Sequence, residues 1–108
     1  MTSARERLED DLREAERELQ MLGERLDDKP KVDPGEGSAG AYSWEMALAR
    51  RERTTERIED LREALNRIDE GAYGRCERCG AQINPERLEI LPTTSLCIAC
   101  AQRQQAQH

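Results

Sequence analysis

Four cysteines near the C-terminus are the residues of this chain whose type and spacing could do chemistry. They form two C-x-x-C pairs with seventeen residues between the pairs: Cys76, Cys79, Cys97 and Cys100. Each pair closes a tight turn that aims two sulfur atoms at one point, and thiolates are soft ligands that suit tetrahedral zinc. Gly80 stands where such a turn often needs a positive φ. Four sulfur ligands leave no position for water, so the spacing predicts one structural zinc ion and not a catalytic metal.

Other uses of the cysteines remain open at this point. Two disulfides would require an oxidising compartment, but the N-terminal residues 1–11 are polar and charged and do not resemble a signal peptide. A thioredoxin-like redox pair would require a βαβ context, for which the sequence gives no sign. A cluster or a different metal is the remaining alternative to zinc.

The composition limits the size of any core. The 108 residues are 36% hydrophobic and 37% charged, contain no Phe, and have a mean hydropathy of −0.93. Such a chain makes at most one ordinary domain, and its core is too small to be stable without a bound metal. The rest of the chain can form a coiled coil, because a coiled coil needs to bury only a narrow seam. No apolar run approaches the roughly 20 residues that cross a bilayer. The sequence therefore predicts a soluble, cytoplasmic protein.

The charge disfavours nucleic acid as a partner. The formal net charge is −6, and residues 1–42 carry 12 acidic and 7 basic side chains, against 11 and 10 in residues 43–108. Zinc modules that bind DNA present a surplus of basic groups to the phosphates, and this surplus is missing. A protein partner is the better expectation.

Two stretches of heptad spacing predict long helices. In residues 3 to about 27, with Ser3 as N-cap and Glu6 completing a capping box, apolar residues alternate steps of four and three. They are Leu8, Leu12, Ala15, Leu19, Leu22 and Leu26. A second helix is expected from 43 to about 69, with Ser43 as a possible cap. Its seam holds Thr54, Ile58, Leu61, Leu65 and Ile68, and extrapolates back to Arg51, Ala47 and Trp44.

The prolines and glycines of residues 28–42 predict a break between these helices. Two helices of similar length, each roughly 40 Å long, then form an antiparallel coiled-coil hairpin over residues 1–70. The loop is either a plain connection or a functional tip. Trp44, at its edge, either fills the end of the seam or anchors a contact.

The remaining residues, 71–108, are expected to form a small C4 zinc finger followed by a short C-terminal helix, which gives a mainly α fold. Gly71 suits the C′ position that ends the second helix. An apolar floor under the metal is expected from four residues: Ile83, Leu88, Ile90 and Leu91. Arg87 is expected to pair with a neighbouring acid, and His108 is expected to be part of the terminus and not a ligand.

A family resemblance rests on these same residues. The segment 71–80 (GAYGRCERCG), then Ile83, 87–89 (RLE), Pro92 and 96–100 (LCIAC) resemble the DksA/TraR C4-type zinc-finger family. The resemblance implies a regulator that binds bacterial RNA polymerase and inserts its hairpin into the secondary channel, where the tip changes the lifetime of promoter complexes. It implies neither catalysis nor binding to specific DNA sequences.

The resemblance also assigns a tip. The family carries Asp-x-x-Asp-x-Ala, and this chain has Asp33, Glu36 and Ser38 at the corresponding positions. Glu36 keeps the charge with one more methylene, and Ser38 replaces alanine with a hydroxyl.

Members that respond to guanosine tetraphosphate at the polymerase interface use basic residues. The corresponding positions here are Asp60, Leu91 and Ala101, while Arg53 is basic. Little or no synergy with this nucleotide is therefore expected.

Together with this resemblance, the sequence predicts a zinc-containing, monomeric transcription regulator that is not an enzyme and binds no membrane. The alternative is a zinc-stabilised coiled-coil adapter with no role at the polymerase active centre. A zinc ribbon that binds nucleic acid is disfavoured by the acidic balance.

Overall fold

The computed structural model describes residues 3–27 and 38–106, and within these residues the protein is built from helices. The helices are α1 (Ala4–Asp27), α2 (Ser38–Asp69), α3 (Pro85–Ile90) and α4 (Ile98–Ala106). One isolated antiparallel bridge joins Arg75 and Gln82. The predicted mainly α fold, with a helical hairpin, a four-cysteine module and a C-terminal helix, is confirmed. None of the described helices is long and apolar enough to span a membrane.

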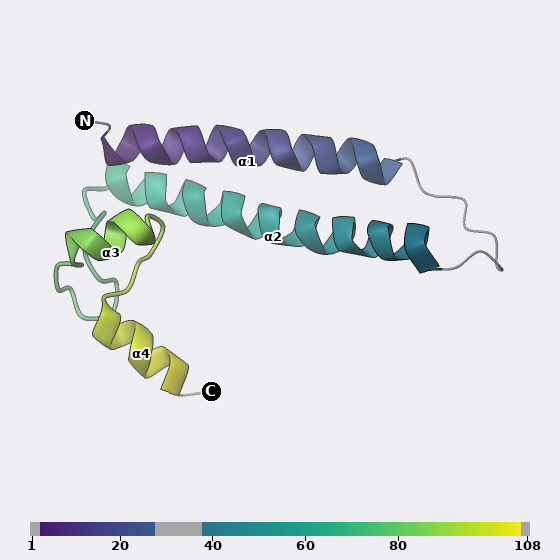
Figure 1. Cartoon of the computed structure of the whole chain (residues 1–108). Helices are drawn as coiled ribbons and strands as arrows, with labels where there is room; N and C mark the ends of the chain where they lie inside the picture. The colour runs from purple at the N-terminus through teal and green to yellow at the C-terminus, as the bar shows by residue number, and fades with distance from the viewer. Residues whose placement is uncertain (1–2, 28–37, 107–108) are drawn as a thin grey trace. The chain divides into compact units, whose positions relative to one another are not determined.

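The chain forms two compact units. One comprises Met1–Asp10 with Asp60–His108, and the other comprises Asp11–Glu59. In each unit, part of α1 lies beside part of α2, and the two helices run in opposite directions (Figure 1). The first unit also contains α3, α4 and all four cysteines.

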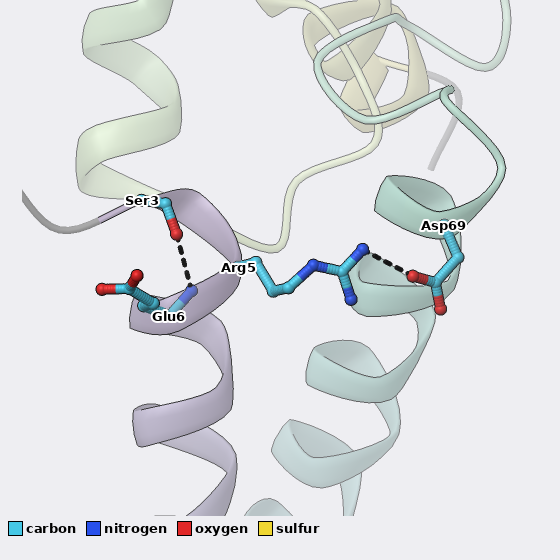
Figure 2. Close-up of polar contacts among 4 residues, drawn as sticks. All are labelled: Ser3, Arg5, Glu6 and Asp69. Carbon is cyan, nitrogen blue, oxygen red and sulfur yellow. Dashed lines mark hydrogen bonds and ion pairs between the residues drawn. The ribbon is translucent and has the colours of Figure 1, made fainter.

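The predicted cap of α1 is present at Ser3. The backbone N–H of Glu6 donates to Ser3 Oγ at 3.2 Å, which satisfies one of the N–H groups that the first helical turn leaves without a partner (Figure 2). Next to it, Arg5 on α1 forms a 2.6 Å ion pair with Asp69 at the end of α2. Both side chains are largely exposed, so this ion pair joins the two helix ends but contributes little to their stability.

The heptad seam supplies the buried residues of both helices. On α1 the buried positions are Leu8, Ala15 and Leu22, and the other predicted seam leucines are half-buried. On α2 they are Thr54, Ile58, Leu61 and Ala64. Ala64 was not predicted, because the heptad step selected its larger neighbour Leu65, which is half-buried. The small Ala64 side chain lies fully inside the seam, where helices can approach closely.

The prediction for the start of α2 was wrong. The helix begins at Ser38 and not at 43, so Ser43 lies within the helix and the predicted loop of 28–42 is shorter on this side. The glycine at 40 suggested a break, but a single glycine between alanines costs about 1 kcal/mol, which helix propagation can offset. Arg51, expected on the seam, is exposed, whereas Trp44 and Ala47 are half-buried.

The end of α2 agrees with the prediction for Gly71. This residue has φ +74°, and its N–H donates to Ile68 O at 3.1 Å while Ala72 N–H donates to Arg67 O at 2.8 Å. These two bonds form a Schellman motif, in which the left-handed conformation at C′ strongly favours glycine. The motif turns the chain from α2 into the cysteine module.

We predict that burial at the seam, and not size alone, decides which apolar residues stabilise this unit. Replacing Leu61, 1% exposed, with Ala removes a buried side chain and should lower the free energy of unfolding by about 2–5 kcal/mol. Replacing Ile90, 79% exposed in the same unit, with Ala should change it by less than about 0.5 kcal/mol. Urea denaturation followed by circular dichroism measures both; equal losses would contradict the seam assignment.

Candidate metal centre and its supports

The first cysteine pair lies in a tight turn of hydrogen-bonded backbone. Cys76 N–H donates to Ala81 O at 2.8 Å, and Gly80 N–H donates back to Cys76 O at 2.9 Å. Gly80 has φ +76°, so the conformation predicted from its place after the second cysteine is present. The turn leaves Cys76 buried and Cys79 exposed at the surface.

The second pair lies at the beginning of α4. Cys97 directly precedes the helix, Cys100 is in its first turn, and Ala101 N–H donates to Cys97 O at 2.9 Å. The N-terminal end of a helix carries partial positive charge and backbone N–H groups, both of which favour thiolates. This placement explains how a C-x-x-C spacing brings two sulfurs to one side of a short helix.

The four sulfur atoms meet at one place. The Sγ atoms of Cys76, Cys79, Cys97 and Cys100 all lie within 4.8 Å of one another, and those of Cys79 and Cys97 are 3.7 Å apart. Four sulfurs at about 2.3 Å from a central zinc would lie about 3.8 Å from one another in a tetrahedron. The donor set and its spacing therefore fit one structural zinc ion.

The electrostatics of the cluster also suit a cation. Hydrogen bonds from backbone N–H groups, first that of Cys97 and then that of Cys79, lower the pKa of the Cys76 thiol to about 6. The backbone N–H of Cys100 likewise lowers the pKa of Cys97. In contrast, a side-chain hydrogen bond with Cys97 raises the pKa of Cys100 to about 12. Loss of the protons from four thiols this close together would bring four negative charges together, and a divalent cation offsets their repulsion.

The apolar floor under the cluster is smaller than predicted. Cys76, Ile83 and Cys100 are its buried core, with three partly buried residues packed against them: Leu88, Leu96 and Cys97. Ile90 and Leu91 are 79% and 47% exposed, so their assignment to the floor was wrong. They lie at the end of α3, a helix that the sequence analysis did not expect and that turns them outward.

The signal for α3 was present in the sequence. Asn84 caps the helix by accepting a 3.0 Å hydrogen bond from Glu86 N–H through Oδ1, and Pro85 occupies the first turn. Asparagine followed by proline is a helix-start signature, because proline lacks the N–H that the first turn cannot use. The six residues of α3 fell below the length at which apolar periodicity can be seen.

Two arginines and a tyrosine support the finger, and the sequence analysis missed this role. Arg67 at the end of α2 donates to Thr93 O at 3.0 Å, and Tyr73 Oη donates to Pro92 O at 2.8 Å. Arg87 donates through Nε to Leu96 O at 3.1 Å, and within residues 3–27 and 38–106 it does not form the expected ion pair with a neighbouring acid. Burial raises the pKa of Tyr73, so its hydroxyl stays protonated and can donate. No spacing rule predicts side chains that bind carbonyls far away in the chain.

Of the three predicted tip residues, the structure describes only Ser38. Asp33 and Glu36 lie outside the described residues, and Ser38 is the first residue of α2. The described helices flank Asp33 and Glu36, since α1 ends at Asp27 and α2 begins at Ser38. Arg50 of α2 forms a 2.7 Å ion pair with Glu18 of α1.

The cysteine geometry, on a helical hairpin, defines a C4-type zinc-finger protein. Residues 71–106 match the model of the prokaryotic DksA/TraR C4-type zinc finger. The chain therefore carries the finger of the DksA/TraR C4 zinc-finger family, as its sequence pattern predicted, and zinc is the metal of that family.

Curated relatives extend the similarity into the helices. The chain is 34% identical over 68 residues to the RNA polymerase-binding transcription factor DksA of Escherichia coli (strain K12) and of Salmonella typhimurium. It is 31% identical over 68 residues to the factor of that name from Haemophilus influenzae. These matches cover 63% of this chain and 45% to 47% of the relatives, so the chain spans about half the length of the curated relatives it matches.

A solved structure matches a larger share of this chain than the curated relatives do. The transcription factor DksA2 from Pseudomonas aeruginosa superposes with a TM-score of 0.81 at 26% identity. The match covers 96% of this chain and 81% of the DksA2 chain. The finger and the helical hairpin are thus found together in a transcription factor.

We predict that acid releases the metal and unfolds the finger. Cys76 has a folded-state pKa near 6, below its ordinary value of 9.0, so its thiolate contributes stability at high pH that is lost as the pH falls through about 6. Zinc shifts this loss to lower pH, since protons must displace the metal from thiolates. In a zinc buffer, zinc release, followed with a chromogenic chelator, should therefore begin below pH 6 and accompany the loss of helical circular dichroism. Full zinc retention and unchanged dichroism at pH 4 would contradict the thiolate site.

Proposed function

We propose that this chain regulates transcription by binding bacterial RNA polymerase at its secondary channel, as a monomer. The observation that carries the proposal is the DksA/TraR finger in a chain whose fold matches transcription factor DksA2 over 96% of its length. The relatives that match part of the hairpin as well are named RNA polymerase-binding transcription factors. The proposed role is regulatory and includes no catalytic step.

In this proposal, Cys76, Cys79, Cys97 and Cys100 ligate the zinc, which is structural. Burial of Cys76 and Cys100 and the mutual spacing of all four sulfurs support this assignment. The zinc holds together a module that has only three buried side chains in its core. In comparable finger peptides, zinc binding contributes about 10–16 kcal/mol to the free energy of folding, which is more than so small a core supplies.

The charge of the chain supports a protein partner over DNA. The formal net charge is −6, and thiolates bound to zinc make it more negative. A protein that bound DNA through this surface would have to overcome repulsion from the phosphates. A channel that admits nucleotides tends to be positive, so an acidic hairpin suits it.

The acidic tip is proposed to exert the regulatory effect. Asp33 and Glu36 are placed by the sequence between the end of α1 and the start of α2. Carboxylates at the connection of two paired helices can reach polar groups or a metal that bulkier parts of the protein cannot approach. The finger would then serve binding, and the tip regulation.

We predict that a change at the tip abolishes regulation but leaves binding to RNA polymerase intact. The double variant Asp33→Asn and Glu36→Gln keeps size but removes both charges. It should bind core RNA polymerase within about twofold of the wild type, yet lose its effect on promoter-complex lifetime. Co-sedimentation or pull-down measures binding, with competition by another secondary-channel factor to identify the site, and a heparin-challenge assay measures lifetime.

The matched control is Glu52→Gln with Glu56→Gln, two exposed carboxylates on α2. It removes the same charge and should retain regulation. A tip variant with unchanged promoter-complex lifetimes would overturn the role of the tip, whereas failure of the wild-type chain to bind polymerase would favour the adapter function.

We predict that guanosine tetraphosphate adds little to the effect of the wild-type chain. Three positions that are basic in responsive members of the family hold Asp60, Leu91 and Ala101, of which Asp60 and Leu91 are exposed. Phosphates need cationic partners, and a carboxylate repels them. The variant Asp60→Lys, Leu91→Arg and Ala101→Lys should gain synergy in transcription assays with and without the nucleotide. Strong synergy in the wild type would contradict this prediction.

A further inference from the structure

One short segment of the finger, residues 92–96, has a side-chain or backbone donor at each of its carbonyl groups. The donors and acceptors are Tyr73 Oη to Pro92 O at 2.8 Å, Arg67 Nη2 to Thr93 O at 3.0 Å and to Thr94 O at 3.4 Å, Glu77 N to Ser95 O at 2.9 Å, and Arg87 Nε to Leu96 O at 3.1 Å. An irregular segment meets its hydrogen-bonding needs in this way because it has no helix or sheet partner of its own. The 92–96 segment is therefore held from several directions.

The donors come from different parts of the unit. Arg67 belongs to the last turn of α2, Tyr73 to the turn after it, Glu77 to the first cysteine pair, and Arg87 to α3. The segment is thus the place where the end of the hairpin helix and the metal module share hydrogen bonds.

Both cysteine pairs adjoin this segment. Cys97 follows Leu96 directly, and Glu77, which donates to Ser95 O, follows Cys76 directly. Metal loading fixes Cys76 and Cys97 with respect to each other, and so fixes the two backbones that the Glu77–Ser95 bond joins. Without the metal, the span between the cysteine pairs regains the conformational freedom that closing it removed.

Arg67 connects the segment to the helix. Its guanidinium binds Thr93 and Thr94, while its own carbonyl accepts from Ala72 and Tyr73 in the Schellman motif that ends α2. The side chain is half-buried, which strengthens its charge-assisted hydrogen bonds relative to exposed ones. One residue therefore participates both in ending the helix and in holding the segment.

We propose that the 92–96 segment transmits metal loading of the finger to the last turns of α2, and that Arg67 is the positioning residue for this coupling. The proposal concerns the folding of the chain itself and does not depend on its binding to polymerase. Coupling free energies are reciprocal. If zinc orders the end of α2 through Arg67, removal of the guanidinium must weaken zinc binding.

The test compares wild type with Arg67→Gln by amide hydrogen exchange, with zinc and after chelation. In the wild type, exchange of the last turns of α2, residues 63–69, should accelerate at least tenfold on chelation. In Arg67→Gln these amides should already exchange fast with zinc bound, and chelation should change them by less than about threefold. Loss of charge-assisted hydrogen bonds should also lower zinc affinity, measured by competition with a chelator, by about tenfold.

Further variants separate coupling from simple destabilisation. Arg67→Lys retains a cationic donor and should restore part of the zinc dependence at α2. Tyr73→Phe deletes only the hydrogen bond to Pro92 O. With zinc bound, it should accelerate amide exchange of residues 63–69, as Arg67→Gln does, but by a smaller factor. Arg103→Gln removes an exposed arginine of α4 and should behave as wild type.

The outcomes that would overturn the proposal are specific. Wild-type protection of residues 63–69 that does not change on chelation would show that metal loading does not reach α2. An Arg67→Gln protein that keeps the wild-type zinc response would show that another contact carries it. If Arg67→Gln fails to fold, Arg67→Lys and Tyr73→Phe provide the test in its place. The proposal is overturned if both variants keep the wild-type response of α2 to chelation and the wild-type zinc affinity.

Discussion

Closure of the chain by four thiolates around one cation is the constraint on which the finger depends. Cys76 and Cys79 are separated from Cys97 and Cys100 by seventeen residues that have only one buried apolar side chain, Ile83. So little buried area cannot offset the entropy of ordering this span. The metal offsets it, and the backbone N–H groups that lower the pKa of Cys76 prepare the cluster for a cation. Metal binding at this site thus stabilises the folded finger.

The same shortage of apolar residues explains how the rest of the finger is built. In addition to its small core, it relies on hydrogen bonds from long side chains to backbone carbonyls, and most of these carbonyls belong to the 92–96 segment. These bonds act over short distances and require their partners to be ordered. We therefore expect a module assembled in this way to be sensitive to loss of its metal.

The helices follow a different physical rule. α1 and α2 bury a narrow seam and leave most of their charged side chains exposed, so they do not need a wide core. The helices and the finger are thus stabilised by different interactions. The exposed Ile90, the last residue of α3, and its neighbour Leu91 show that the finger does not bury every apolar residue it has.

The sequence by itself determined the features that depend on local spacing. The cysteine pairs, the heptad seam, the Ser3 cap and the Gly71 terminus each follow from rules over a few residues, and the structure contains all of them. Only the tertiary structure decided that α2 starts at Ser38, that α3 turns two apolar residues outward, and that arginines hold the 92–96 segment. These features depend on contacts between residues distant in the chain or on small differences in helix propensity, and neither leaves a periodic signal in the sequence.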